Sequence, residues 1–152
     1  MPTNILRKTS DASKPKPRPA AVRGDVRRAL LKIGRVSVRI ELAATTTADL
    51  IWNALPLHSS AETWGASIHF EVPLEAGRDR TARINGTAGD IHFWVENDRI
   101  LVPFGTTPIS KPGESRLPSP CNIWAKALDD ISTLATVLAK VTPGEKVSLF
   151  AA

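Results

Sequence analysis

The chain has 152 residues, of which 42% are hydrophobic and 23% charged, a composition typical of a soluble globular protein with a single core. Its only cysteine, Cys121, excludes a disulfide within the chain and a zinc site built from cysteines. No apolar run approaches the ~18 residues that span a bilayer, and the start lacks the apolar core of a secretory signal. We therefore expect a cytoplasmic protein.

The formal charge of +5 is distributed unevenly along the chain. Residues 1–40 hold eleven lysines and arginines with two acids, whereas residues 41–152 hold nine with thirteen acids. Residues 1–34 are also polar and rich in proline, so they bury too little apolar surface to offset their ordering entropy. We predict a disordered basic extension over residues 1–34 and one folded domain over residues 35–152.

Two roles are open for this extension. Its cationic side chains suit an arm that binds nucleic acid, and the alternative is a solvated tail without a role of its own. The segment VRRALLKI at residues 26–33 has apolar residues on one helical face, which predicts a short helix that docks on the domain or on a partner. Because the extension has few apolar side chains, removal of residues 1–33 is expected to leave the domain's stability nearly unchanged.

The domain begins with a strand, a helix and a second strand. In residues 36–42 apolar and polar side chains alternate, which is typical of a half-buried strand. Thr45, Thr46 and Thr47 are candidate N-caps, and the apolar stripe that Pro56 ends predicts a helix of about ten residues. A loop with His58 follows. Residues 64–73 predict the second strand, because alternate positions are apolar.

Residues 89–110 carry the clearest hairpin pattern of the chain. Apolar residues alternate over 91–95 and again over 100–104, and Glu96, Asn97 and Asp98 between them favour a turn. Before this hairpin, residues 74–88 predict a connection with at most a short strand near 81–84. After it, four prolines and two glycines in residues 105–120 predict a long ordered loop without regular structure.

The last part of the chain predicts a strand, a helix and a final strand. Residues 122–128 alternate, and Asp129 and Asp130 provide acidic caps for a helix with apolar residues at 131, 134, 135 and 138. Pro143 and Gly144 end that helix before a strand over residues 146–150. Antiparallel hairpins with few helices favour a closed barrel, because closure removes exposed strand edges. We predict a mainly β fold, a closed β-barrel of about eight strands with two short capping helices.

Three segments carry a family resemblance: WGASIHFEVP at residues 64–73, GDIHFW at 89–94 and FGTTPIS at 104–110. On these segments the chain resembles small, uncharacterised bacterial and archaeal proteins with a cyclophilin-like fold, over about residues 35–150. The resemblance implies an eight-stranded β-barrel with a helix at each end, and no established activity for most members. Function must therefore be argued from the site and not from the fold.

The resemblance also bears on prolyl isomerase activity. True cyclophilins place an arginine beside an apolar proline pocket, on a strand with an FHR-type motif. In this chain the segment IHF at 68–70 is followed by Glu71, so that arginine is missing. Arg83 and Arg99 are the plausible substitutes, and we expect both to be solvated and too mobile to preorganise a site.

Other residue patterns give no catalytic or metal site. His69 and His92 on neighbouring strands could share a metal ion, yet no HxH or HExxH spacing occurs, so we expect no metal site. No serine lies in a GxSxG elbow, and Cys121 is expected to be a small buried apolar residue. The catalytic residues stay unknown, and no cofactor is indicated.

The aromatic residues carry the functional prediction. Tryptophan and phenylalanine side chains in the predicted strands suit an aromatic-lined cleft, and the alternative is that they fill the barrel. Five residues are predicted to bind a ligand: Trp64, Phe70, Trp94, Phe104 and, at the rim, Thr107. We predict a binding module that holds a small molecule or a peptide segment. A weak prolyl isomerase and an interaction protein whose basic arm reaches nucleic acid are the alternative functions.

Overall fold

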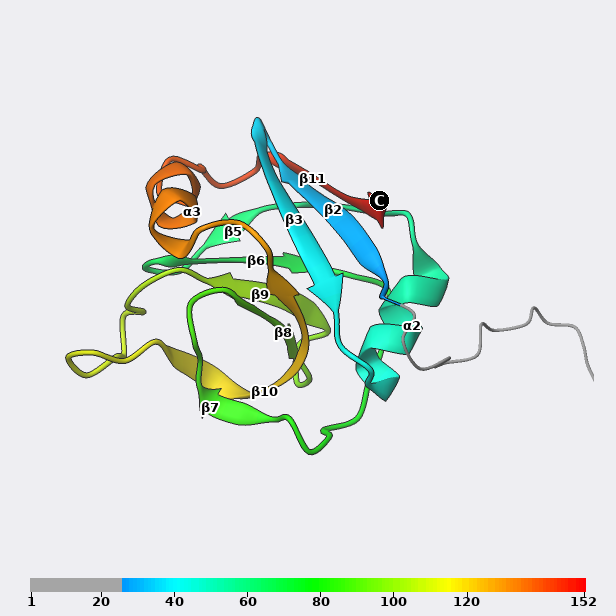
Figure 1. Cartoon of the computed structure of the whole chain (residues 1–152). Helices are drawn as coiled ribbons and strands as arrows, with labels where there is room; N and C mark the ends of the chain where they lie inside the picture. Colours follow the sequence, from blue (N-terminus) through cyan, green and yellow to red (C-terminus); the bar gives the residue numbers. More distant parts are fainter. Residues whose placement is uncertain (1–25) are drawn as a thin grey trace, which may run out of the picture.

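The computed structural model describes residues 26–152 of the chain. Within them, ten strands form one antiparallel sheet, and two helices lie beside it (Figure 1). The elements in chain order are β2 (Arg28–Ile33), β3 (Val36–Leu42), α2 (Thr46–Ala54), β4 (Leu57–Ser60), β5 (Glu62–Thr63), β6 (Ser67–Glu71), β7 (Arg83–Asn85), β8 (Asp90–Trp94), β9 (Arg99–Pro103), β10 (Arg116–Ala127), α3 (Ile131–Leu138) and β11 (Lys146–Ala151).

The sheet rolls around a core without closing. Its strands follow the order β4-β11-β2-β3-β10-β8-β9-β6-β5, and β7 pairs with β10 beside this path. The edge strands β4 and β5 are consecutive in the chain and separated only by Ala61. The Ala61 amide donates to the Glu145 carbonyl at 2.8 Å, and its carbonyl accepts from the Gly144 amide at 2.7 Å. The mainly β class is confirmed, but the closed barrel is not, since no ladder joins the two edges within residues 26–152.

The start of the sheet differs from the sequence prediction. Residues 28–33 form β2, which pairs with β11 on one side and β3 on the other, so the predicted helix in this segment is wrong. Ala29, Leu31 and Ile33 point into the core, and Arg28 and Lys32 are exposed. The sheet thus takes in residues that we assign to the extension from the sequence. The disorder predicted for residues 1–25 falls outside the described residues.

The central hairpin and both helices agree with the sequence. In the hairpin, β8 pairs with β9 so that Phe93 faces Ile100, and Asp98 in the turn has a φ of 51°, which aspartate tolerates. The first helix, α2, is capped by Thr45, whose hydroxyl accepts from the Ala48 amide at 3.1 Å. The second, α3, is capped in the same way by Asp130.

Two segments predicted as loops contain strands. His58 lies in β4, which pairs with β11. The predicted loop over residues 105–120 ends early, because β10 begins at Arg116 and contains Pro118 and Pro120. The register of β10 against β7 shifts between Arg116 and Cys121, so the missing amides of the two prolines fall where the ladder is already irregular.

The main core fills the inside of the rolled sheet. Figure 1 shows α2 and α3 at opposite ends of the roll. Ile51 of α2 is 1% exposed, and Leu134 and Leu138 of α3 are buried in the same core. The largest fully buried side chains of this core include Trp124, Phe70, Phe93, Ile40, Ile68, Ile91 and Ile100. Each helix therefore covers one end of the roll with a narrow apolar stripe.

A buried polar network attaches the connection before β7 to the sheet. The Asn122 side chain is fully buried, accepts from the Asp79 amide at 2.9 Å, and donates to Thr47 at 3.0 Å and to the Gly77 carbonyl at 2.8 Å. Asp79 in turn accepts from the Thr81 amide at 2.8 Å. Since every polar group of Asn122 has a partner, the network stabilises this irregular segment despite its polarity.

A second, smaller apolar cluster lies on the outer face of the sheet. Leu101, Leu117 and Cys121 are fully buried in it, and Trp94 packs against them. His92 also has no exposed surface, and neither of its ring nitrogens has a hydrogen-bond partner. Burial lowers the pKa of His92 to about 4, and the nearby Asp90 backbone opposes this shift only in part. The fold therefore buries a neutral imidazole in an apolar layer.

We expect removal of residues 1–33 to unfold the domain or to lower its melting temperature strongly. This truncation deletes β2 from the middle of the sheet and removes Leu31 and Ile33 from the core, each worth about 1.5–3 kcal/mol of burial. That loss is comparable with the roughly 5–15 kcal/mol by which domains are stable. Removal of residues 1–25 is the control, because it keeps β2. Thermal unfolding followed by circular dichroism checks both truncations, and equal melting temperatures for them would contradict the assignment of β2.

We expect His92 to make the domain less stable in mild acid. Its folded pKa of about 4 lies below the unfolded value near 6.5, so its contribution is complete above pH 6.5 and is lost as the pH falls toward 4. The loss should reach about 2 kcal/mol at pH 5 and about 3 kcal/mol below pH 4. Urea unfolding at pH 7 and pH 5 measures it. His92→Leu should remove this part of the pH dependence and the exposed His58→Leu should keep it; the same pH dependence in all three proteins would contradict the prediction.

Candidate functional site

The structure does not bring the five predicted ligand-binding residues into one cleft. Phe70 is 1% exposed and belongs to the main core, and Trp94 packs against the outer cluster. Thr107 is buried, where its hydroxyl donates to the Arg116 carbonyl at 2.5 Å. Trp64 is half-buried in the turn before β6, and Phe104 lies beside the main core. These residues therefore lie in separate places: Phe70 and Phe104 at the main core, Trp94 at the outer cluster and Thr107 beside Arg116.

The alternation of the sheet explains this separation. Phe70 faces Ile100 on β9, and Ile100 faces Phe93 on β8, so these three side chains share the inner face. Trp94, the next residue of β8, points to the opposite face. Its ring meets the His69 ring edge-on, with the ring centroids 5.7 Å apart. An aromatic wall with both Phe70 and Trp94 is thus incompatible with the register of these strands.

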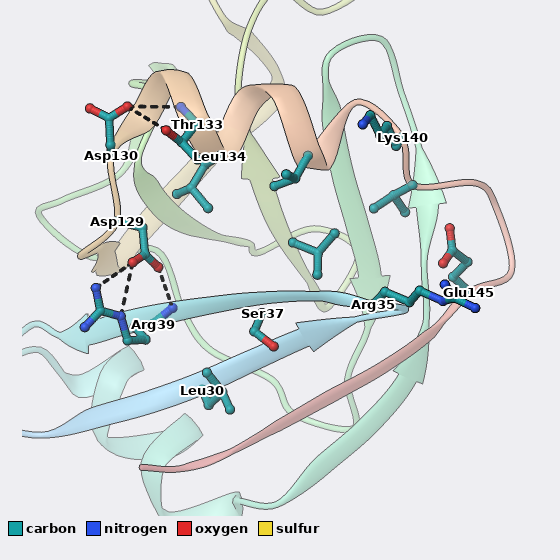
Figure 2. Close-up of a pocket in the computed structure, with 13 residues that line it drawn as sticks. Leu30, Arg35, Ser37, Arg39, Asp129, Asp130, Thr133, Leu134, Lys140 and Glu145 are labelled. Carbon is teal, nitrogen blue, oxygen red and sulfur yellow. Dashed lines mark hydrogen bonds and ion pairs between the residues drawn. The ribbon is translucent and has the colours of Figure 1, made fainter.

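A groove of about 850 Å³ lies between α3 and the hairpin of β2 and β3 (Figure 2). None of the five predicted residues lines it. Its apolar lining comes from both walls: Leu30, Val36, Leu134, Val137 and Val141. Its charged lining comprises Arg35, Arg39, Asp129, Asp130, Lys140 and Glu145. The groove thus combines apolar side chains from both walls with charged groups at both ends, and small-molecule sites use such polar groups to orient a ligand on an apolar surface.

The turn at Gly34 and the segment after α3 form one end of the groove. Gly34 has a φ of +59°, a conformation that favours glycine, and connects β2 to β3. A Cβ atom at this position would collide with the Glu145 carboxylate. Glu145 is held there because it accepts from the Thr142 amide at 2.6 Å and from its hydroxyl at 3.1 Å. A side chain at position 34 would thus displace the border of the groove.

An ion pair forms the other end of the groove. Arg39 on β3 donates to Asp129 through its backbone amide at 3.1 Å and through its guanidinium at 2.6 and 3.1 Å. These bonds hold the pKa of Asp129 below its usual value. The next residue, Asp130, caps α3 by accepting from Ser132 and Thr133, which likewise lowers its pKa. The contact fixes the start of α3 against β3, and Arg39 engages both oxygens of Asp129, whereas the helix cap engages one oxygen of Asp130.

Arg35 and Lys140 differ from the other charged residues of the groove. Both are exposed, and the structure gives neither an ion pair nor a side-chain hydrogen bond within residues 26–152. Figure 2 shows Arg35 beside Glu145 and Lys140 on the opposite wall just after α3, both away from the Arg39–Asp129 pair. These two cations are therefore available to a ligand.

A smaller pocket of about 340 Å³ lies beside the end of α3. Phe104 lines it together with Thr63, Gly65, Ala66 and Leu138. Of the five predicted residues, only Phe104 borders this pocket, which has no charged lining group. It therefore offers less for specific recognition than the groove at Arg35.

The histidines and the cysteine lie in separate environments. His58 is exposed and meets the Ser148 hydroxyl at 3.3 Å, whereas His92 is in the outer cluster. In the part of the chain that the structure describes, no three His, Cys, Asp or Glu side chains are grouped as metal ligands would be. Cys121 is buried as expected, and burial raises its pKa to about 12, which keeps the thiol protonated and unreactive.

Arg99 is not solvated in the way that the sequence suggests. It is half-buried on β9, and its Nη1 lies 3.2 Å from Nδ1 of His69. Burial, with Arg99 as the second cause, lowers the pKa of His69, so the ring is neutral and can accept this hydrogen bond. Arg83 is exposed, as expected, and donates to the carbonyls of Arg80 and Ala82.

The groove residues are absent from the sequence prediction because the signal for them is weak. Leu30 is an apolar residue between the exposed Arg28 and Lys32 on the outer face of β2. An apolar position on a polar strand face indicates a contact or a binding surface, but only if the segment is first identified as a strand. The spacing of Arg35 and Lys140 in the chain carries no such signal. The proposed nucleic-acid arm lies largely in residues 1–25, outside the described residues.

Comparison with known proteins agrees with this fold. The chain matches the family model described as cyclophilin-like over residues 27–149. The solution structure of the hypothetical protein AF2241 from Archaeoglobus fulgidus is similar, with a TM-score of 0.71 and 26% identity, over 87% of this chain and 99% of that one. The structure of McbB in complex with tryptophan has a TM-score of 0.62 and 15% identity, over 80% of this chain and 44% of that one.

No curated protein matches the sequence. Within residues 26–152, neither helix is long and apolar enough to cross a membrane. The family model begins at Arg27, one residue before β2, and ends in β11, so it spans the whole rolled sheet. The chain therefore belongs to the cyclophilin-like family.

Proposed function

We propose that this protein is a binding module that holds a small molecule in the groove between α3 and the β2–β3 hairpin. The observation that carries the proposal is the groove itself, with an apolar lining and charged groups at its ends. The binding role is the one predicted from the sequence, but its place in the fold is different. The aromatic cleft gains no support from the geometry, because its residues face different layers.

The dimensions and chemistry of the groove support a small ligand. Its volume of about 850 Å³ falls in the range of about 300–1,000 Å³ that small-molecule sites occupy. Val36 and Val137 come from opposite walls and are half-buried, so an apolar molecule between them would gain contact on both sides. Its walls belong to regular elements held by the Arg39–Asp129 contact, which preorganises the site.

One protein with a part of similar fold binds a small molecule. McbB has been determined in complex with tryptophan, a small aromatic amino acid. At 15% identity the likeness concerns the fold alone, so no residue of that site is transferred to this chain. The similar part is 44% of McbB, and the tryptophan complex is a property of that whole protein. It names one class of compact ligand, an amino acid with an apolar ring, that can be tested on this chain.

We expect Ser37→Trp to block binding of a neutral apolar probe. Ser37 is exposed and lines the groove, so an indole there fills the space without changing the core. The probe is N-phenyl-1-naphthylamine, whose fluorescence rises in apolar surroundings, and its Kd should increase at least about tenfold, or about 1.4 kcal/mol. Ser60→Trp is the matched control, because Ser60 is exposed on β4 and lies outside the groove lining. Equal affinity of both variants would place binding elsewhere.

Prolyl isomerisation is an alternative function, for which the guanidinium of Arg99 is the candidate cationic donor. Arg99 lies beside His69 and Trp94 on the outer face of the sheet, a cation with aromatic neighbours. One of its guanidinium N–H groups is bound to His69, and it borders neither the groove nor the smaller pocket, so neither of them offers an apolar proline pocket beside it. We therefore expect no acceleration of isomerisation in a proline-containing test peptide. A protease-coupled assay measures the rate. Turnover that disappears in Arg99→Ala and persists in the exposed Arg83→Ala would instead make the protein an isomerase.

The nucleic-acid function stays a prediction for the basic extension. The affinity of an arm that neutralises several phosphates falls steeply as the salt concentration rises. The affinity of the groove for a neutral ligand should depend little on salt. Titration of the full chain with single-stranded DNA at two salt concentrations distinguishes the two functions.

A further inference from the structure

We propose that the ligand of this groove is a small amphipathic anion, with a carboxylate or similar group at Arg35 and Lys140 and an apolar body along the groove. This inference rests on the proposed function and specifies the class of ligand. It is carried by the charges that border the groove and by the partners that those charges already have.

The acidic groups of the groove are already engaged within the protein. Asp129 receives three hydrogen bonds from Arg39. Asp130 accepts from the hydroxyl of Ser132 and from the amide and hydroxyl of Thr133, at 2.5, 3.0 and 3.1 Å. Asp129 has little capacity left for a cationic ligand, because Arg39 binds both of its oxygens. Asp130 is engaged through Oδ2 alone, where it caps α3.

The basic groups are engaged unequally. Arg39 is used by Asp129, but Arg35 and Lys140 have neither an ion pair nor a side-chain hydrogen bond within residues 26–152. Glu145 lies beside Arg35 in Figure 2, and its Oε2 accepts from the amide and hydroxyl of Thr142. This side of the groove thus has two cations and one carboxylate, so its net charge is positive.

The remaining lining between these ends is apolar. Leu134 and Val141 are buried, and Leu30, Val36 and Val137 are half-buried beside them. A fully polar anion would gain little binding free energy from these apolar side chains, because they would remain in contact with water or with the polar groups of the anion. A molecule with an apolar body and one terminal anion satisfies both parts of the lining, since a guanidinium and an ammonium are strong donors to a carboxylate.

The test compares an anionic and a neutral probe of similar shape. The anion is 8-anilinonaphthalene-1-sulfonate, and the neutral probe is N-phenyl-1-naphthylamine, which lacks the sulfonate. The double variant R35A/K140A removes the two available cations. The double variant R78A/K111A removes the same net charge from exposed positions outside the groove lining, so it controls for the general field of the protein. Fluorescence titration of the folded full-length protein gives the Kd of each pair.

R35A/K140A should raise the Kd of the sulfonate at least about tenfold and change that of the neutral probe by less than about twofold. R78A/K111A should leave both affinities within about twofold. If the neutral probe binds and Ser37→Trp blocks it, but R35A/K140A does not weaken the sulfonate more than R78A/K111A does, the anion proposal is wrong and the groove function stands. If the neutral probe does not bind the unmodified protein, or Ser37→Trp leaves its affinity unchanged, the proposed function is wrong as well.

Discussion

The pairing of β10 with strands on both sides determines the shape of this molecule. Ala125 faces Leu42 of β3 on one side and Ile91 of β8 on the other, so this strand joins the two halves of the sheet. Its register against β8 shifts between Ile123 and Ala125, which allows the Trp124 side chain to enter the core. The Trp124 indole donates to the His92 carbonyl at 3.3 Å, so a hydrogen bond and core packing both stabilise the register shift. Without this strand there would be two small sheets and no roll.

The groove is a consequence of the same strand. β10 ends at Ala127, and Asp129 follows after one residue, so the bond from Arg39 fixes α3 where the chain leaves the sheet. Leu134 and Leu138 then bury one side of α3 in the core, while Val137 and Lys140 border the space above β3. A helix that covers the end of a rolled sheet cannot also fill the gap beside the adjoining hairpin. The site thus arises between elements whose positions are determined by the core.

The sequence predicts those parts of the fold that depend on neighbouring residues. The β8–β9 hairpin and both helices are right, because alternation, turn residues and caps act within a few positions. Residues 28–33 are misassigned because Ala29 and Ile33 fit a helical stripe as well as a strand face, and only the pairing with β3 and β11 decides between them. Tertiary pairing overrides local spacing here.

The site was beyond prediction from the sequence for a different reason. Arg39 and Asp129 are 90 positions apart in the chain, and whether Arg35 is available to a ligand depends on which acids the fold has already engaged. The aromatic residues of the strands suggest one shared site when they are considered by type, but strand alternation places Phe70 and Trp94 on opposite faces of the sheet. The sequence shows which side chains are present, whereas the register of the strands determines which of them are neighbours.

The corner at Ala61 has a consequence for contacts between molecules. An unpaired strand edge presents free amides and carbonyls to other chains, and proteins with open sheets must protect such edges from aggregation. Here the two ends of the strand path are strands of four and two residues that meet at a single alanine, whose own amide and carbonyl are bonded to Glu145 and Gly144. The further edge strand β7, which within residues 26–152 pairs only with β10, has three residues. A neighbouring chain therefore finds only a few consecutive positions at which it could add a strand. The rolled sheet gains most of the protection of a barrel without a closing ladder.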